Sequence, residues 1–363
     1  IVNTTSGCLS VADFQGSMTQ ARNAGAFLQN NSWGVISQGA YRGFDADADA
    51  ATWLLEDLLV AVAAGNDGPV GGSIGTPGVA KNVLTVGALG NGNSTAVASF
   101  SSRGPTDDGR IKPDLMAPGT STYSAAGNSN DGPEIQPGVS SVKSGTSMAS
   151  PTALGGAALM RQYFVEGYYP RGERDPSGTD ALSPSAALMK AVLLNGTAII
   201  GPWPSAGAGW GRIHLDGSLY FAGHSRRFRL FERAHADGLR SGESHQYSLP
   251  IAGGEEIRVT LVWMDPEADP GAAINLVNDL DLIVDGPSGQ LLGNWLINSY
   301  SQPGGSADRV NTVEQIRLPA TAAGGLYNLT VHAHRVPGNA RQDSDRQGYA
   351  LVVSGRIGLP DGA

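Results

Sequence analysis

The spacing of apolar residues along the chain changes near residue 222. In the first part, short apolar runs alternate with helical patterns and glycine-rich connections, which is typical of a parallel sheet covered by helices. Residues 58–64 form an almost unbroken apolar run that ends at Gly65 and Asn66, and residues 83–88 form another. Both runs are predicted to be buried central strands, and the first is expected to end in a turn.

Two helices are predicted in the same part of the chain. Residues 148–164 are apolar and contain small residues that allow close packing, so this helix is expected inside the domain. Residues 185–194 form the second predicted helix, and we expect Pro184 to lie in its first turn.

Apolar residues alternate with polar ones in the second part of the chain. This period of two is typical of half-buried strands, and turns rich in Gly, Pro, Asn and Asp separate them. The sequence therefore predicts an α/β parallel-sheet domain over residues 1–222 and an all-β jelly-roll or β-barrel domain over 223–363, with the polar stretch 224–242 at their junction. The predicted strands include 246–249, 257–263, 280–284 and 326–331.

Composition limits the partners and the sources of stability. At 363 residues the chain is long enough for about two domains, and 24 basic against 33 acidic residues give a net charge of −9. An acidic surface repels phosphate groups, so we expect neither nucleic acid nor a membrane as a partner. No apolar run reaches the roughly 18 residues needed to cross a bilayer, and any export signal is expected outside this chain. The single cysteine, Cys8, cannot form an internal disulfide, which directs attention to bound ions.

A serine lies where a glycine-containing turn meets the predicted helix 148–164. Backbone N–H groups at a helix N-terminus favour negative charge, so Ser147 is placed where an oxyanion would be stabilised. Asn66 follows the predicted strand 58–64 at the edge of the sheet where ligands bind, and its amide suits an oxyanion hole. Residues 31–34 form another predicted strand end, whose backbone is suited to pairing with an extended peptide. Taken alone, Ser147 is equally well explained as a helix N-cap, and Asn66 is better explained as a turn residue.

Four segments, in this order along the chain, resemble the motifs of the subtilisin-like serine peptidases. They are Ala63-Ala64-Gly65-Asn66-Asp67-Gly68, Phe100-Ser101-Ser102-Arg103-Gly104-Pro105, Lys112-Pro113-Asp114-Leu115-Met116-Ala117-Pro118-Gly119 and Gly145-Thr146-Ser147-Met148-Ala149-Ser150-Pro151. The resemblance covers nearly the whole chain and is greatest to bacterial alkaline proteases with a C-terminal β-barrel. It implies a secreted protein in which an N-terminally incomplete subtilisin-like domain precedes a barrel.

The resemblance also implies roles for individual residues. Ser147 would be the nucleophile that forms an acyl-enzyme, and Asn66 would donate to the oxyanion. The expected function is a serine endopeptidase that acts on proteins and peptides and prefers uncharged side chains before the cut. The substrate groove and the specificity pocket would be lined by Ser32, Trp33, Gly34, Ala63, Ala64 and Gly65.

The family's catalytic Asp and His lie before the segment matched by residues 31–34, and this chain has neither motif there. All six histidines follow Ser147, and His214 lies in a segment that the family places far from the nucleophile. One interpretation is a longer natural protein, with a missing N-terminal fragment or a second copy covering the edge of the sheet. In a second, Lys143 activates Ser147 in a serine hydrolase or esterase, although a solvated lysine is the simpler explanation. In a third, the chain binds peptides without cutting them.

Acidic side chains gather in three segments of the predicted β domain, around residues 265–269, 278–281 and 308–314. Calcium takes about six to eight oxygen ligands, often from separate loops. The related proteases associate the equivalent barrel segments with calcium, while solvated carboxylates explain any single residue equally well. The best candidates for Ca²⁺ ligands are Asp279, Asp281, Asp308 and Glu314, with Asp114 of the first domain as a weaker one.

Overall fold

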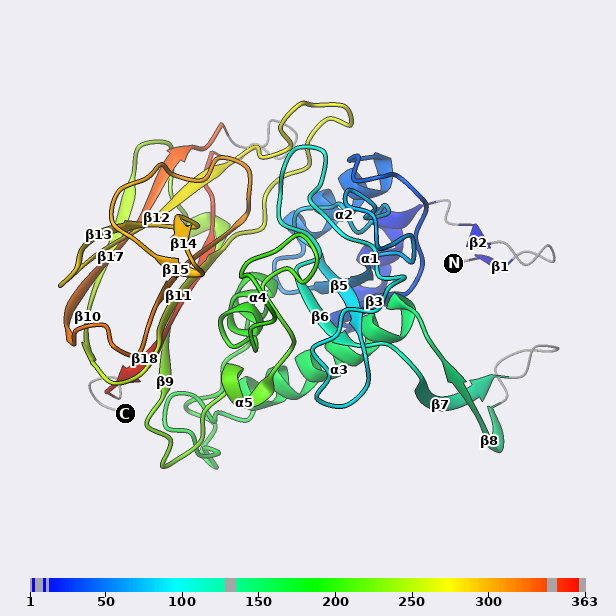
Figure 1. The fold of residues 1–363 in the computed structure, drawn as a ribbon, viewed down its shortest axis with the longest axis horizontal. Helices are drawn as coiled ribbons and strands as arrows, with labels where there is room; N and C mark the ends of the chain where they lie inside the picture. Colours follow the sequence, from blue (N-terminus) through cyan, green and yellow to red (C-terminus); the bar gives the residue numbers. More distant parts are fainter. Residues whose placement is uncertain (1, 4–8, 11–12, 128–134, 338–344, 359–363) are drawn as a thin grey trace.

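The structure, a computed structural model, describes residues 2–3, 9–10, 13–127, 135–337 and 345–358 (Figure 1). Cys8 lies outside these ranges. The described residues form a helix-covered parallel sheet and an antiparallel, barrel-like sheet that lie side by side. None of the helices described is long and apolar enough to cross a membrane.

The parallel sheet has four strands in the order β3-β4-β5-β6. Its two central strands are buried along their whole length, because helices cover both faces and leave no position for polar alternation. This confirms the strands predicted at 58–64 and 83–88. The strands are β3 (Leu28–Asn31), β4 (Leu59–Ala63), β5 (Leu84–Leu89) and β6 (Leu115–Pro118).

Helices cover both faces of this sheet. Leu59 and Ala61 of β4 pack with α3 and α4, while Val60 and Val62 pack with α1 and α2. Successive side chains of a strand point to opposite faces, which explains this division. The helices are α1 (Phe14–Asn23), α2 (Gly43–Leu54), α3 (Thr146–Val165), α4 (Ala186–Asn195) and the short α5 (Leu215–Ser218).

Both predicted helices are confirmed as α3 and α4, with one correction at the start of α4. Ser185 is the N-cap of this helix, and its Oγ accepts a hydrogen bond from the Leu188 N–H at 3.0 Å. Pro184 therefore lies before the cap, and the prediction that it occupies the first turn is wrong. A serine hydroxyl satisfies one of the unpaired N–H groups at a helix start, which a proline ring cannot do.

The second sheet is antiparallel and curls into a nearly closed barrel of eight strands (Figure 1). β18 joins its two halves, since it pairs with β9 and β11 along most of its length and with β10 at its end. The structure confirms a barrel-like all-β unit but does not confirm a jelly-roll topology. The strand order is β13-β12-β17-β10-β18-β11-β16, with β9 on the free side of β18.

The first strand of the barrel lies within the stretch predicted as a polar junction. β9 pairs with β18 along its length, and its Phe228 and Phe231 pack against the two main apolar cores. The junction is therefore shorter than residues 224–242. The barrel strands are β9 (Arg227–Arg233), β10 (Ser244–Ala252), β11 (Ile257–Val262), β12 (Asp279–Gly286), β13 (Gly289–Leu292), β16 (Val313–Leu318), β17 (Gly325–Arg335) and β18 (Tyr349–Ile357).

A hairpin stands away from the body of the molecule and leads directly into α3 (Figure 1). Its strands are β7 (Thr122–Gly127) and β8 (Ile135–Lys143), and Lys143 is the last residue of the second. The remaining small elements are β1 (Val2–Asn3), β2 (Leu9–Ser10), β14 (Leu296–Ile297), β15 (Tyr300–Ser301) and the 3₁₀ turn η1 (His235–Asp237).

Candidate active site

The turn after β4 fixes the position of Asn66. Gly65 has a φ of +108°, and a Cβ at this residue would lie 2.7 Å from Ser102 Oγ, so only glycine fits. Asn66 Oδ1 accepts hydrogen bonds from the Thr146 N–H at 2.9 Å and from Thr146 Oγ1 at 3.0 Å. Because a backbone N–H must donate, the amide oxygen of Asn66 faces Thr146 and its NH₂ group is left for another acceptor.

Pro151 in α3 explains how Ser147 is held. Proline has no N–H, so the carbonyl of Ser147, four residues earlier, lacks its partner within the helix. Ser32 supplies that partner, because its Oγ donates to the Ser147 carbonyl at 2.8 Å. In return, Ser147 Oγ donates to the Ser32 carbonyl at 3.1 Å. Two reciprocal hydrogen bonds thus join the end of β3 to the start of α3.

Two hydrogen-bond donors at this point are not used by the residues that the structure describes. The first N–H groups of a helix have no intrahelical acceptor, and the Ser147 N–H is one of them. Within the described ranges, neither this N–H nor Asn66 Nδ2 has a hydrogen-bond partner. The helix dipole favours negative charge at the same place. This arrangement can receive an oxyanion next to a serine hydroxyl.

A pocket of about 260 Å³ opens beside Ser147. Ser32 contacts Ser147 through the hydrogen bonds above, and Ala64 is fully buried next to the pocket wall. The pocket brings together six of the residues predicted from the sequence, namely Trp33, Gly34, Ala63, Gly65, Asn66 and Ser147. It also contains five that the sequence analysis missed, namely Val35, Ile36, Asp67, Gly75 and Thr146.

The missed residues differ in how far the sequence signals them. Asp67 and Thr146 adjoin predicted site residues, so proximity along the chain was a usable signal. Ile36 is an exposed apolar residue that follows the predicted groove segment. Gly75 reaches the pocket only because Val35 pairs with Thr76, a contact between distant segments that no local pattern indicates.

Neither histidine nor lysine lines this pocket among the described residues. His214 is the residue before α5, and His235 stacks on Trp53 with ring centroids 3.6 Å apart. Lys143, the alternative base, is exposed at the end of β8. The described residues therefore supply a serine hydroxyl and two donors, but no imidazole or amine placed to take the serine proton.

The four predicted calcium ligands lie near one another in the barrel. Arg309 Nη1 donates to Asp281 Oδ1 and, at 3.3 Å, to Asp279 Oδ1. Glu314 is buried, and its Oε1 has no hydrogen-bond partner among the residues described. Burial, and then the charge of Asp308, raises the pKa of Glu314 well above its usual value. Within the described part of the chain, no group of three or more His, Cys, Asp or Glu side chains is arranged to hold a metal ion, so calcium stays a prediction.

Asp114, the weaker calcium candidate, forms buried ion pairs. Its Oδ2 accepts from Lys112 Nζ at 2.6 Å, and its Oδ1 lies 3.0 Å from Lys190 Nζ. Burial alone would raise the pKa of Asp114, but the two lysines hold it below the usual value. Because both oxygens face lysines, the structure gives Asp114 an ion-pair role in place of the expected metal role.

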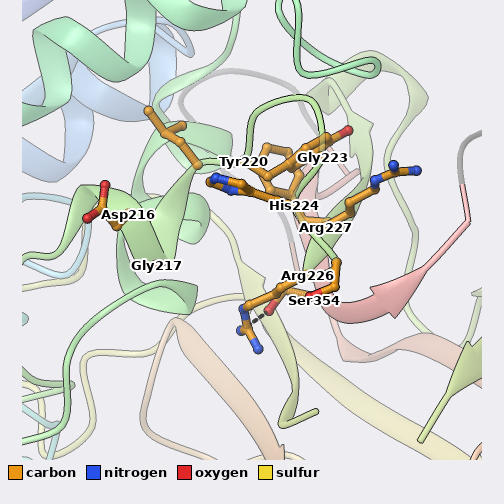
Figure 2. Close-up of a pocket in the computed structure, with 11 residues that line it drawn as sticks. Asp216, Gly217, Tyr220, Gly223, His224, Arg226, Arg227 and Ser354 are labelled. Carbon is orange, nitrogen blue, oxygen red and sulfur yellow. Dashed lines mark hydrogen bonds between the residues drawn. The ribbon is translucent and has the colours of Figure 1, made fainter. Parts of the chain in front are cut away.

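A second hollow, of about 350 Å³, lies between α5, the segment that follows it, and the barrel strands β9 and β18 (Figure 2). It is lined by residues between 216 and 228 and by Ser354. Arg226 donates to Ser354 Oγ at 2.5 Å and to the Glu256 carbonyl at 2.7 Å, so this partly buried guanidinium connects the segments around β9, β11 and β18. No residue lines both this hollow and the Ser147 pocket, and the two are separate features.

The residues that line the Ser147 pocket lie in the part of the chain that matches a known family. A sequence profile described as the subtilase family matches residues 1–211, which include Asn66 and Ser147. The serine protease/ABC transporter B family protein tagD of Dictyostelium discoideum is 32% identical over 286 residues, which cover 62% of this chain and 15% of that protein. The serine protease AprX of Bacillus subtilis is 45% identical over 115 residues, which cover 29% of this chain and 26% of AprX. The chain thus spans only a small part of the length of either relative.

Solved structures give a weaker match. The prenylagaramide maturation protease PagA covers 59% of this chain and 68% of its own at 24% identity, with a TM-score of 0.44.

Proposed function

This chain belongs to the subtilase family, and we propose from that membership that it is a serine endopeptidase whose nucleophile is Ser147. Ser147 Oγ loses its proton and attacks the carbonyl carbon of the peptide bond, whose oxygen becomes an oxyanion. The C–N bond then breaks, the amine leaves with a proton on its nitrogen, and water hydrolyses the resulting acyl-enzyme. The observation that carries the proposal is the pair of unused donors, the Ser147 N–H and Asn66 Nδ2, beside the serine hydroxyl.

The donors act on the transition state more than on the bound peptide. Charge develops on the carbonyl oxygen only as the serine attacks, so donors held in place beforehand stabilise that charge without reorganising. Thr146 holds Asn66 through the amide oxygen, which leaves the NH₂ group oriented for this purpose. Each such donor contributes about 10²- to 10³-fold in rate in enzymes of this kind.

The pocket beside Ser147 receives the side chain that precedes the cut. Its lining is mostly backbone of small residues together with the apolar Trp33, Val35 and Ile36, while Asp67 is its charged member. An extended peptide would lie against the segment after β3, where backbone groups are available for strand-like pairing. Protein and peptide substrates are proposed on this basis and on the names of the relatives, which are serine proteases.

A second candidate function is peptide binding without cleavage. It is favoured by one observation, which is that no imidazole or amine among the described residues lines the pocket. Serine is a weak nucleophile unless a neighbouring base takes its proton. A third, ester hydrolysis with Lys143 as the base, is disfavoured because Lys143 is exposed and outside the pocket lining.

Incubation of the chain with an unfolded protein substrate separates the first two functions. Mass spectrometry of the products should find internal cleavage with the unmodified chain and none with Ser147→Ala. Tight binding of the same substrate with no product from either protein would establish the binding function and contradict the peptidase. Lys143→Met should cleave at the unmodified rate, and loss of cleavage in that variant would instead support Lys143 as the base.

We also propose that Asp279, Asp281, Asp308 and Glu314 hold a structural Ca²⁺. What supports it is the buried Glu314 Oε1, which has no hydrogen-bond partner among the described residues, and the influence of the Asp308, Asp281 and Asp279 charges on Glu314, of which Arg309 pairs with the last two. The secretion that the family resemblance implies would expose the protein to the millimolar calcium at which extracellular sites bind. Calcium should raise the melting temperature of the unmodified chain and not that of Glu314→Gln, and an equal shift in both would place the ion elsewhere.

A further inference from the structure

The loop between β11 and β12, residues 263–278, leaves the barrel and lies against the parallel sheet and its helices, which we call the peptidase part of the molecule (Figure 1). Its central residue Ala268 is 8% exposed and packs in one apolar cluster with Tyr41, Ala64 and Ile74. Ala64 directly follows the lining residue Ala63, and Ile74 directly precedes the lining residue Gly75. A barrel residue therefore packs behind the wall of the Ser147 pocket.

Hydrogen bonds fix Ala268 against this wall. The Ala268 N–H donates to the Tyr41 hydroxyl at 3.3 Å, and the same hydroxyl donates to Asp49 Oδ2 at 2.8 Å. Burial, and then the charge of Asp49, raises the pKa of Tyr41, so the hydroxyl stays protonated and keeps its donor. Tyr41 thus connects the barrel loop to α2 of the peptidase part.

The start of the loop is tied down by buried polar groups. Asp265 N–H donates to Asn82 Oδ1 at 2.7 Å, and Asn82 Nδ2 donates back to the Asp265 carbonyl at 2.9 Å. Lys81 Nζ donates to Asp265 Oδ2 at 2.5 Å and to the Asn275 carbonyl at 2.9 Å, with no part of the lysine or aspartate side chain exposed. These contacts leave the loop little freedom to move relative to residues 74–82.

The wall that the loop supports is also held by its own backbone hydrogen bonds, among them one from the Gly39 N–H to the Ile74 carbonyl at 2.9 Å. Gly75 N–H donates to the Ala64 carbonyl at 3.1 Å, and Thr76 N–H donates to the Val35 carbonyl at 3.0 Å. The Val35 N–H also donates back to the Thr76 carbonyl at 2.9 Å, and these bonds together connect three segments of the pocket wall, which come after β3, after β4 and before β5. The apolar cluster that contains Ala268 also contains Ala64, whose carbonyl accepts one of these bonds, and Ile74, which precedes Gly75.

We propose that the β11–β12 loop of the barrel positions the wall of the Ser147 pocket, with Ala268 and Tyr41 as positioning residues that set its shape. The proposal rests on the proposed function, in that this pocket receives the substrate side chain. The barrel then takes part in specificity, because removing its contact lets Ile74 and Gly75 move away from Val35.

Amide hydrogen exchange of the full chain tests the contact without requiring activity. Tyr41→Phe removes the hydroxyl that accepts from the Ala268 N–H, and Ala268→Gly removes the methyl group that Ala268 contributes to the cluster with Ala64 and Ile74. In both variants, exchange at the Gly75 and Thr76 amides should be at least about fivefold faster than in the unmodified chain. The matched control is Tyr163→Phe, which removes a hydrogen bond of 2.7 Å from a tyrosine equally buried in α3.

A general loss of stability would accelerate exchange in the control as much as in the two test variants. Equal rates at Gly75 and Thr76 in Tyr41→Phe, Ala268→Gly and Tyr163→Phe would therefore overturn the proposal. Acceleration confined to the two test variants supports it. Where either test variant is too unstable to purify, the other decides the outcome.

A functional measurement extends the test to specificity. On a series of peptide esters that differ in the side chain entering the pocket, Ala268→Gly should change the ratio of KM for large and small side chains at least about threefold, with kcat retained. An unchanged ratio would overturn the role in specificity. A chain with no turnover on any ester would count against the proposed function, while the exchange measurement would still decide whether the loop positions the wall.

Discussion

The front and the back of the Ser147 pocket are built in different ways. The front consists of Ser147, Asn66 and Ser32, whose polar groups include two donors unused among the described residues. The back consists of Tyr41, Ile74 and Ala268, which are buried in an apolar cluster where the one hydroxyl both donates and accepts. The front of the pocket therefore provides polar groups that can bind a substrate, while the back determines the shape of the pocket.

This difference follows from access to water. Asn66 is exposed and Ser147 is partly exposed, so their free donors bind water while the pocket is empty and cost little. A donor left without a partner at the buried back would cost about 1–3 kcal/mol. Changes at the front should therefore alter the chemistry and spare the stability, while changes at the back should alter stability and shape.

The largest expected effect is at the front. Ser147→Ala should lower ester turnover by at least about 10³-fold, because the covalent intermediate cannot form. Its free energy of unfolding should stay within about 1 kcal/mol of the unmodified value, since one hydrogen bond to Ser32 is lost. Steady-state kinetics and urea unfolding check the two parts, with Ser248→Ala on the barrel surface as the control. Turnover above half of the unmodified rate would show that Ser147 is not the nucleophile.

The next largest effect is on stability and comes from the buried ion pair at the start of the β11–β12 loop. Lys81→Met leaves Asp265 buried without its cation and should lower the free energy of unfolding by about 3–5 kcal/mol. Lys143→Met removes an exposed lysine and should change it by less than about 0.5 kcal/mol. Urea unfolding of both variants compares a buried with an exposed lysine. Equal free energies of unfolding in the two variants would show that the ion pair between Lys81 and Asp265 does not stabilise the protein.

A smaller effect isolates one donor at the front. Asn66→Asp keeps the oxygen that accepts from the Thr146 N–H and removes the NH₂ group, so kcat should fall about 10²- to 10³-fold. The kcat of Asn66→Ala should fall by a similar factor. The KM of both variants should change less than about threefold, because the donor acts on the transition state. Retention of kcat by the aspartate variant would mean that Asn66 serves only to hold Thr146.

The smallest effect concerns pH at the contact between α2 and η1, where the His235 ring lies tilted against Trp53. Burial lowers the pKa of His235 to about 4, while the unfolded chain takes up this proton near pH 6.5. Below pH 6.5 the unfolded state therefore binds more protons, and the free energy of unfolding should fall by about 2 kcal/mol by pH 5. His235→Phe should remove this part of the pH dependence and the exposed His224→Gln should keep it. Identical pH profiles for the unmodified chain and His235→Phe would contradict the assignment.

The sequence allowed the front of the pocket to be predicted and not the back. Ser147 and Asn66 belong to contiguous motifs, and each motif also specifies its own turn or helix start, as Gly65 and Pro151 show. Ala268 gives no such signal, because an alanine in a loop has no chemistry of its own. Its role depends on Tyr41 and Ile74, which lie about 200 residues away in the sequence.

The same distinction holds for the fold. The apolar runs of β4 and β5 and the alternation in the barrel strands indicate their structure locally, and both were predicted. The order of the barrel strands depends on which edges meet, as at β18, where β9, β10 and β11 all pair. β9 itself was missed because its many arginines made residues 224–242 look like a polar junction.

The most direct test of the account is the intact mass of the full chain after treatment with a fluorophosphonate, which labels only activated serine hydroxyls. The account predicts a single adduct that is absent from Ser147→Ala, is greatly slowed in Asn66→Asp, and forms at the unmodified rate in Lys143→Met. Absence of any adduct, or an adduct that persists in Ser147→Ala, would contradict the claim that Ser147 is the nucleophile of this chain.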